Sequence, residues 1–253
     1  MPLELIEDPK KIPEKPEVGS IVLPVKRRTL AVRIATPQII CLGKNYAEHA
    51  KELGSAPPEE PLLFAKAYSS LIKNGQPIVH PGRSFGRVDH EVELAVILGK
   101  SAWQVPAAEA ASVIFGFTVL NDVTARDLQG ILNSKGHPWF LSKSFATFCP
   151  IGPIVVPARE LDPSNLTLEC RVNGIVRQRS NTREMIHPVP KLVEYISARI
   201  PLLPGDIIAT GTPAGIGPLK PGDSVLCRVE GIGDLENPVK ENLGKGINDQ
   251  KLS

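Results

Sequence analysis

The sequence lacks the features that define several large classes of protein. No apolar run in its 253 residues approaches the roughly 20 residues that a membrane-spanning helix needs, so we expect no membrane partner. Its 29 basic and 27 acidic residues nearly cancel and are spread along the chain, which gives no indication of a nucleic-acid partner. The N-terminal stretch MPLELIEDPKK has acidic residues where a signal peptide has a basic start and an apolar run, so we expect a cytoplasmic protein.

Cysteine is scarce, and its spacing excludes the usual metal and redox motifs. The four cysteines are Cys41, Cys149, Cys170 and Cys227, and they form no CxxC or Cys/His ligand pattern. We therefore expect reduced, buried thiols and no zinc site. The glycine-rich segment 210–217 lacks the GK[ST] ending of a phosphate loop, although its glycines would let the backbone approach a ligand.

What is present indicates one large domain, or one domain with a small appendage. The composition, 42% hydrophobic and 22% charged, is ordinary for a globular protein. Short β-type runs dominate, and a hairpin is predicted around Asn173-Gly174, which is a strong turn signal. Helical patterns are confined to short segments, near residues 47–53, 105–112 and 189–199. Residues 1–37 hold a Lys/Glu/Pro-rich lead and a second expected hairpin, at 20–35, which we expect to pack on the main domain.

The most informative stretch is residues 89–98, DHEVELAVIL. From Val92 onward it predicts a buried strand, whose side chains alternate between two faces, so Glu91 and Glu93 share one face. Two carboxylates two residues apart beside a core strand repel each other and resist desolvation, so they need a compensating cation. A divalent metal site of hard oxygen ligands meets that need. The alternative is a solvated strand end with two exposed acids.

Two further segments carry candidate site residues. Asp122 follows an apolar, β-branched run at 113–120, where it could be a third metal ligand or the N-cap of the next helix. His49 and Glu52 are three residues apart on a short predicted helix, hence neighbours on one face. Such a pair is usually a surface pair, but a short helix flanked by Gly43 and Gly54 could also act as a lid that carries catalytic groups.

Six motifs, in this order and at these intervals, together resemble the fumarylacetoacetate hydrolase family: GKNYAEHAKE, FAKAYSS, DHEVELAVILGK, LNDVTARDLQ, KGHPWFLSKSF and TGTPAGIG. The nearest branch comprises acylpyruvases, oxaloacetate decarboxylases and hydroxyheptadienedioate isomerases. The resemblance covers residues 38–240 and leaves a polar tail at 241–253. It implies an α+β, β-rich fold of the mixed β-sandwich roll type, a homodimer, and a bound Mg²⁺ or Mn²⁺.

The resemblance also implies roles for individual residues. The metal ligands would be Glu91, Glu93 and Asp122. The catalytic residues would be His49, Glu52 and Lys143, and substrate contacts would come from Arg126, Gln129 and Thr212. FAKAYSS offers no carboxylate, whereas the hydrolase that gives the family its name has a further aspartate ligand; this counts against fumarylacetoacetate as the substrate.

The expected function is hydrolysis of acylpyruvates or decarboxylation of oxaloacetate, that is, chemistry of small 2-oxo acids through an enolate that the metal stabilises. Hydrolysis needs a base to activate water, for which a His oriented by a Glu is suited. The main alternative is an isomerase or decarboxylase of unsaturated 2-oxo diacids from aromatic catabolism, with substrate size set by the loop 133–140 and the lid. The remaining alternative, from another class, is a metal-stabilised module without turnover.

Overall fold

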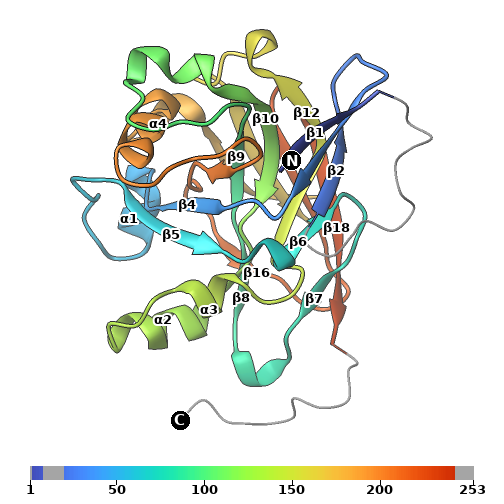
Figure 1. Ribbon diagram of the computed structural model, residues 1–253. Helices are drawn as coiled ribbons and strands as arrows, with labels where there is room; N and C mark the ends of the chain where they lie inside the picture. Colours follow the sequence, from blue (N-terminus) through green and yellow to red (C-terminus); the bar gives the residue numbers. More distant parts are fainter. Residues whose placement is uncertain (1, 8–19, 243–253) are drawn as a thin grey trace.

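The computed structural model describes residues 2–7 and 20–242, and the strands among them form four sheets (Figure 1). The expected polar tail therefore lies almost wholly outside the described residues, as does most of the lead before residue 20. The strands are β1 Leu3–Ile6, β2 Ser20–Pro24, β3 Ala31–Ala35, β4 Ile39–Gly43, β5 Leu62–Lys66, β6 Leu71–Lys73, β7 Ile78–His80, β8 Val88–His90, β9 Val92–Leu98, β10 Ile114–Asn121, β11 Thr124–Ala125, β12 Cys149–Pro157, β13 Thr167–Val172, β14 Ile175–Asn181, β15 Ile207–Ala209, β16 Gly217–Pro218, β17 Ser224–Val229 and β18 Gly233–Glu241.

Helices are few and short. The α-helices are α1 Ala47–Glu52, α2 Arg126–Ser134, α3 Phe140–Lys143 and α4 Val189–Ser197; the 3₁₀ helices are η2 Tyr68–Ser70, η3 Arg83–Phe85, η4 Ala107–Ser112, η5 Ala158–Glu160 and η6 Thr182–Glu184. The helix expected near 105–112 is thus a six-residue 3₁₀ segment, which lies between its N-cap, Pro106, and its C-cap, Val113, and leads directly into β10. Segments of 3₁₀ helix often serve as connectors of this kind. None of the described helices has both the length and the apolar character needed to cross a bilayer.

A seven-stranded mixed sheet forms the centre of the molecule, in the order β5-β4-β15-β9-β10-β12-β6. A five-stranded sheet, β14-β13-β17-β18-β7, packs on one face of it, and the three-stranded sheet β1-β3-β2 packs on the other. The remaining three strands pair as β11-β8-β16. Figure 1 shows α2 and α3 beyond the β5 edge of the central sheet. The central sheet is therefore covered on both faces, which explains the continuous apolar character of β9.

Strand β9 shows how the two cores divide. Leu94, Val96 and Leu98 pack in the core shared with the five-stranded sheet. Ala95 and Ile97 face the opposite way and pack in the core shared with the N-terminal hairpin. All seven residues of β9 are buried, and the predicted alternation of faces is confirmed. Because Glu93 lies on the same face as Ala95, a carboxylate enters the interior of the protein at this strand.

The two predicted hairpins are present. β2 pairs with β3 in the N-terminal sheet, and β13 pairs with β14 across Asn173 and Gly174, both of which have positive φ as a two-residue turn of this kind requires. The four cysteines are buried free thiols, as expected.

Candidate active site

Three buried carboxylates meet where β9 and β10 pair. Glu91 precedes β9, Glu93 lies within it, and Asp122 follows β10. The antiparallel register places Asn121 opposite Val92, and the backbone N–H of Asp122 donates to the carbonyl oxygen of Glu91 at 2.8 Å. One carboxylate oxygen from each acid lies within 4.8 Å of the other two. Asp122 does not cap a helix, because α2 begins four residues later, after Ala125.

Two buried lysines neutralise part of this negative charge. Lys143, from α3, donates to Glu91 Oε2 at 2.9 Å, to Asp122 Oδ2 at 2.6 Å and to Thr124 Oγ1 at 2.7 Å. Lys66, at the end of β5, donates to Asp122 Oδ1 at 2.6 Å and to the carbonyl oxygen of Val123 at 3.1 Å. Both oxygens of Asp122 are therefore paired with an ammonium group, and its side chain is fully buried.

An arginine completes the set of cations. Arg126, the first residue of α2, donates from Nη2 to Glu91 Oε1 and from Nε to Asp89 Oδ2 at 2.8 Å. Its Nη1 donates to Gln129 Oε1 at 2.5 Å, so these two residues share a face of α2. Arg87, which is partly exposed, donates to the other oxygen of Asp89 at 2.6 Å. Arg126 is thus held in place by two buried carboxylates.

Glu93 differs from its two neighbours. Its Oε2 accepts a hydrogen bond from the backbone N–H of Gly211 at 2.8 Å, and among the described residues no cationic side chain forms a salt bridge with it. Burial and the negative charges of Asp122 and Glu91 raise the pKa of Glu93. Burial also opposes ionisation of Glu91, but Lys143 and Arg126 outweigh it, so the pKa of Glu91 is lowered.

This donor set fits a hard divalent cation. Three carboxylates supply the oxygen ligands that Mg²⁺ and Mn²⁺ prefer. Glu93, buried and without a salt bridge among the described residues, would gain most from a bound ion, because the positive charge would offset both its burial and the neighbouring carboxylates that raise its pKa.

His49 and Glu52 form the second part of the site. His49 Nδ1 lies 3.1 Å from Glu52 Oε2, and the His49 side chain is 5% exposed. The other oxygen of Glu52 accepts the backbone N–H of Gly215 at 3.0 Å. An ionised carboxylate can only accept hydrogen bonds, so Nδ1 of His49 carries the proton that is donated to Glu52. The other ring nitrogen, Nε2, is left as an acceptor. The pair is therefore partly buried and tied to the glycine-rich segment, unlike the surface pair that was the alternative.

One pocket brings most of the sequence-predicted site residues together. Those that line it are His49, Glu91, Glu93, Arg126, Gln129, Lys143 and Thr212. Asp122 is hydrogen-bonded to one of these lining side chains, Lys143, and Glu52 to another, His49, but neither lines the pocket itself. The hydroxyl of Thr212 donates to the carbonyl oxygen of Val92 and accepts from Gln178. One lone pair of that hydroxyl therefore remains for a substrate.

Sequence reasoning missed three residues of this pocket region. Lys66 ends the apolar strand β5, and a lysine in that position is itself a signal of a buried ion pair. Phe64 and Trp139 line the pocket and pack edge to face, with ring centroids 5.6 Å apart. Lys143 Nζ lies 4.7 Å from the centroid of the Phe64 ring. In the loop 133–140, Trp139 is the residue that reaches the pocket, whereas residues 133–138 are mostly exposed.

Comparison with known proteins decides the family. The family model of the fumarylacetoacetate (FAA) hydrolase C-terminal region matches residues 38–240. This chain belongs to the fumarylacetoacetate hydrolase family. It is 42% identical to the mitochondrial oxaloacetate tautomerase FAHD1 of Arabidopsis thaliana, over 81% of this chain and 92% of the relative.

Two solved structures of the family are also similar. Fumarylpyruvate hydrolase from Pseudomonas aeruginosa, in complex with Mn²⁺ and pyruvate, is 31% identical and covers 90% of this chain and 98% of its own, with a TM-score of 0.82. 2-Hydroxyhepta-2,4-diene-1,7-dioate isomerase from Mycobacterium marinum is 41% identical, with coverages of 84% and 79% and a TM-score of 0.73. The β-rich fold that the motifs implied is confirmed, and the family's members include a hydrolase, an isomerase and a tautomerase.

Proposed function

We propose that this protein is a divalent-metal-dependent enzyme of small 2-oxo acids, which hydrolyses acylpyruvates and acts on oxaloacetate. The observation that carries the proposal is that His49, oriented by Glu52, lines the same pocket as Glu91 and Glu93. A base and a cluster of hard oxygen ligands thus face one small volume. The Mn²⁺ and pyruvate held by the fumarylpyruvate hydrolase of P. aeruginosa support both the metal and the substrate class.

Each residue has a part in binding or charge balance. Glu91, Glu93 and Asp122 would hold Mg²⁺ or Mn²⁺, which supplies Lewis acidity toward the carbonyl oxygen of the substrate. Lys143 keeps its positive charge in the interior, because Asp122 and Glu91 raise its pKa against the effect of burial. Lys143 and Arg126 therefore add positive charge to a pocket that receives an anionic substrate.

His49 is the proposed base. Nδ1 donates to Glu52, so Nε2 accepts a proton, either from water that attacks an acylpyruvate or from C3 of oxaloacetate during tautomerisation. Glu52 stabilises the imidazolium that results. The relative from A. thaliana named as an oxaloacetate tautomerase favours the second use. Decarboxylation of oxaloacetate needs no base at this position, and so it should depend less on His49.

The walls of the pocket favour a small substrate. Trp139 and Phe64 form an aromatic wall beside Gly43, where an added Cβ would lie 3.0 Å from the Trp139 ring. Gln129 uses its carbonyl oxygen on Arg126, which leaves its amide N–H groups for a substrate oxygen. A short 2-oxo acid suits this enclosure.

An isomerase of longer unsaturated 2-oxo diacids is the second candidate. The similarity to the isomerase from M. marinum favours it. It requires Trp139 to move, since that residue closes one wall of the pocket. A non-catalytic module has less support, because a base, its orienting carboxylate and a buried lysine all converge on the metal-ligand cluster.

The deciding experiment compares three reactions in wild type and in His49→Gln, with Mg²⁺ present: hydrolysis of acetylpyruvate, tautomerisation of oxaloacetate and its decarboxylation. Hydrolysis and tautomerisation should fall by roughly 10²–10⁴, the usual value of general-base catalysis, and decarboxylation much less. His137→Gln, in the exposed loop, is the matched control and should leave all three rates unchanged. Equal losses in all three reactions would contradict the role of His49 as a base. Turnover of longer diacids alone would support the isomerase.

Metal dependence is tested separately. Chelation by EDTA should abolish activity, and Mg²⁺ or Mn²⁺ should restore it, because the ligands are all hard oxygens. Glu93→Ala should abolish activity without recovery. Full activity of that variant in EDTA would contradict the assignment of the metal site.

A further inference from the structure

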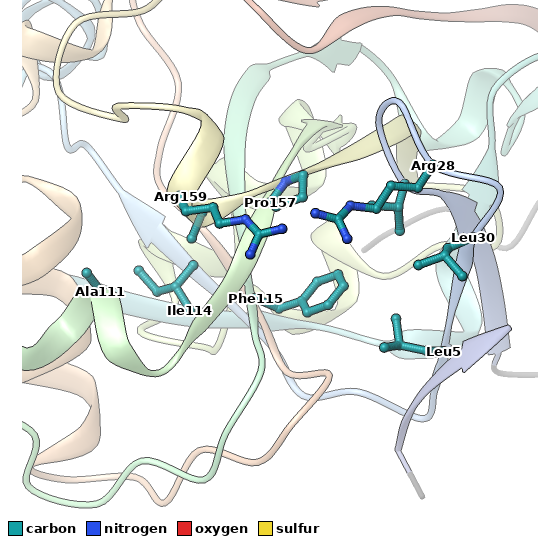
Figure 2. Close-up of a pocket in the computed structure, with 10 residues that line it drawn as sticks. Leu5, Arg28, Leu30, Ala111, Ile114, Phe115, Pro157 and Arg159 are labelled. Carbon is teal, nitrogen blue, oxygen red and sulfur yellow. The ribbon is translucent and has the colours of Figure 1, made fainter. Parts of the chain in front are cut away.

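A second pocket lies far from the candidate active site, between the N-terminal hairpin, the start of β10 and η5 (Figure 2). Its volume is about 340 Å³, near the lower end of the roughly 300–1,000 Å³ typical of small-molecule sites. Ile114 and Phe115 line it at one end of β10, while Asp122 follows the other end of the same strand, roughly 23 Å away at about 3.3 Å per residue. The two pockets share no lining residue.

The floor of this pocket is apolar, and among the described residues none covers it. Phe115 and Leu30 are half-buried, and Leu5 is 50% exposed. All three side chains face the same cavity (Figure 2). An apolar surface of this kind gains free energy when an apolar ligand removes it from water.

The rim of the pocket is cationic. Figure 2 shows the guanidinium groups of Arg28 and Arg159 facing each other across the cavity, above Phe115. Arg28 Nη2 lies 3.4 Å and Arg159 Nε 3.9 Å from the same oxygen, Oε1 of Glu160. One carboxylate oxygen therefore serves two guanidinium groups, at distances longer than a good hydrogen bond, and an excess positive charge remains.

The adjoining surface increases this excess. Lys26 and Arg27 line a recess that also contains Arg28 and Glu160. Lys26 Nζ donates to the carbonyl oxygen of Gly231 at 2.5 Å and keeps its positive charge. Among the described residues that line the pocket and this recess, the cationic side chains of Lys26, Arg27, Arg28 and Arg159 thus outnumber the single carboxylate, Glu160. Guanidinium groups bind carboxylates through paired N–H donors, so an anion placed between Arg28 and Arg159 would replace repulsion with hydrogen bonds.

We propose that this pocket binds a small amphipathic carboxylate. Its carboxylate lies between Arg28 and Arg159, and its apolar body lies on Phe115 and Leu30. The two requirements are separable: an anion alone lacks the apolar contact, and an apolar cation would be repelled at the rim. The site does not depend on the chemistry at Glu91 and Glu93, so it stands or falls independently of the proposed enzymatic function.

The test is isothermal titration of the whole protein with octanoate, acetate and octylamine. Octanoate should bind saturably at one site, whereas acetate and octylamine should bind at least tenfold more weakly. The Arg28→Gln, Arg159→Gln double variant should lose at least tenfold in octanoate affinity, because two charge-assisted contacts are removed. Arg177→Gln, which removes a charge from the exposed face of β14, is the control and should bind octanoate as wild type does.

Localisation and competing outcomes complete the test. Amide chemical shifts of labelled protein should change at residues 28, 115 and 159 on addition of octanoate. Equal binding of octanoate and octylamine, or unchanged affinity in the double variant, would overturn the proposal. If octyl phosphate binds more tightly than octanoate, the pocket prefers a phosphate head group, and the proposed carboxylate ligand is overturned. A third outcome is that octanoate does not bind, and that sedimentation shows an oligomer in wild type and a monomer in Phe115→Glu. That outcome would overturn the proposal and assign the pocket to an interface between two copies of the chain.

Discussion

Charged side chains at the two ends of β10 differ in how they are stabilised. Near Asn121, buried acids and bases are paired at 2.6–2.9 Å, and the lysines there are almost fully buried. Near Phe115, two arginines share one carboxylate oxygen at 3.4 and 3.9 Å, and the Arg159 side chain is 72% exposed. Water can solvate the charges at the second end, whereas at the first end every charge must find a partner within the protein.

This difference shows how far the protein's own side chains balance the buried negative charge. Lys66, Lys143 and Arg126 already balance most of the charge on the buried carboxylates. The sequence alone suggested that a metal must relieve the repulsion between Glu91 and Glu93. Within the protein that need is concentrated on Glu93, and the remaining acids are paired with side chains.

The largest contrast should come from removing one cation at each end. Lys143→Met leaves Glu91 and Asp122 short of a buried partner, and breaking such a pair costs about 3–5 kcal/mol of unfolding free energy. Arg159→Met should stay within about 0.5 kcal/mol of wild type, because its charge is solvated. Urea unfolding in EDTA measures the free energy of unfolding of both variants and of wild type. Similar losses in the two variants would contradict the comparison.

A smaller effect is expected at the glycine that contacts Glu93. Gly211 has φ +93°, and an added Cβ would lie 2.8 Å from Asn45 Cβ. Gly222 has φ +98° with no heavy atom within 4 Å of the added Cβ, so it shares the backbone strain without the clash. Gly211→Ala should therefore lose about 1–3 kcal/mol more than Gly222→Ala. Equal losses in thermal unfolding would mean that the contact with Asn45 is easily relieved.

The pH dependence of the metal-free protein should give the smallest effect. The pKa of Glu93 is raised in the folded protein, so the native state keeps a proton that the unfolded chain loses near pH 4.3, about the ordinary value. The corresponding stability is complete below that pH and is lost as pH rises through the folded pKa, at no more than about 1.4 kcal/mol per pH unit.

Glu91 acts in a separate range of pH. Its pKa is lowered, so its contribution is complete above the ordinary value and is lost only as pH falls below it. The free energy of unfolding is measured against pH in EDTA for wild type and for Glu93→Gln. The difference between the two slopes above about pH 4.3 gives the contribution of Glu93. If the variant has the same slope as wild type, the pH dependence of stability comes from groups other than Glu93.

How much the sequence could predict depended on the range of the contacts. The hairpin at Asn173-Gly174 and the helix that carries His49 follow from neighbouring residues, and both are confirmed. The convergence of Glu91, Glu93 and Asp122 was implied by family motifs, and the antiparallel register of β9 and β10 brings it about.

Long-range partners were beyond reach. Lys66 and Asp122 are 56 residues apart, and Glu52 and Gly215 are 163 apart. No local pattern specifies either contact, because each joins segments that meet only in the folded protein. Three strands of the central sheet separate β5 from β10, and Glu52 on α1 meets the 210–217 segment. The same holds for the pocket between Arg28 and Arg159, whose residues come from four segments of the chain.

The hydrogen bond from the backbone N–H of Gly215 to Glu52 makes one backbone amide a reporter on α1, the helix that carries the proposed base. While α1 is docked, Glu52 Oε1 holds that N–H, and its exchange with deuterium should be slow. An excursion of α1 would release the amide and allow exchange. Peptide-resolved deuterium uptake would thus count openings of the site in the resting protein, without substrate and without any label attached to the helix itself.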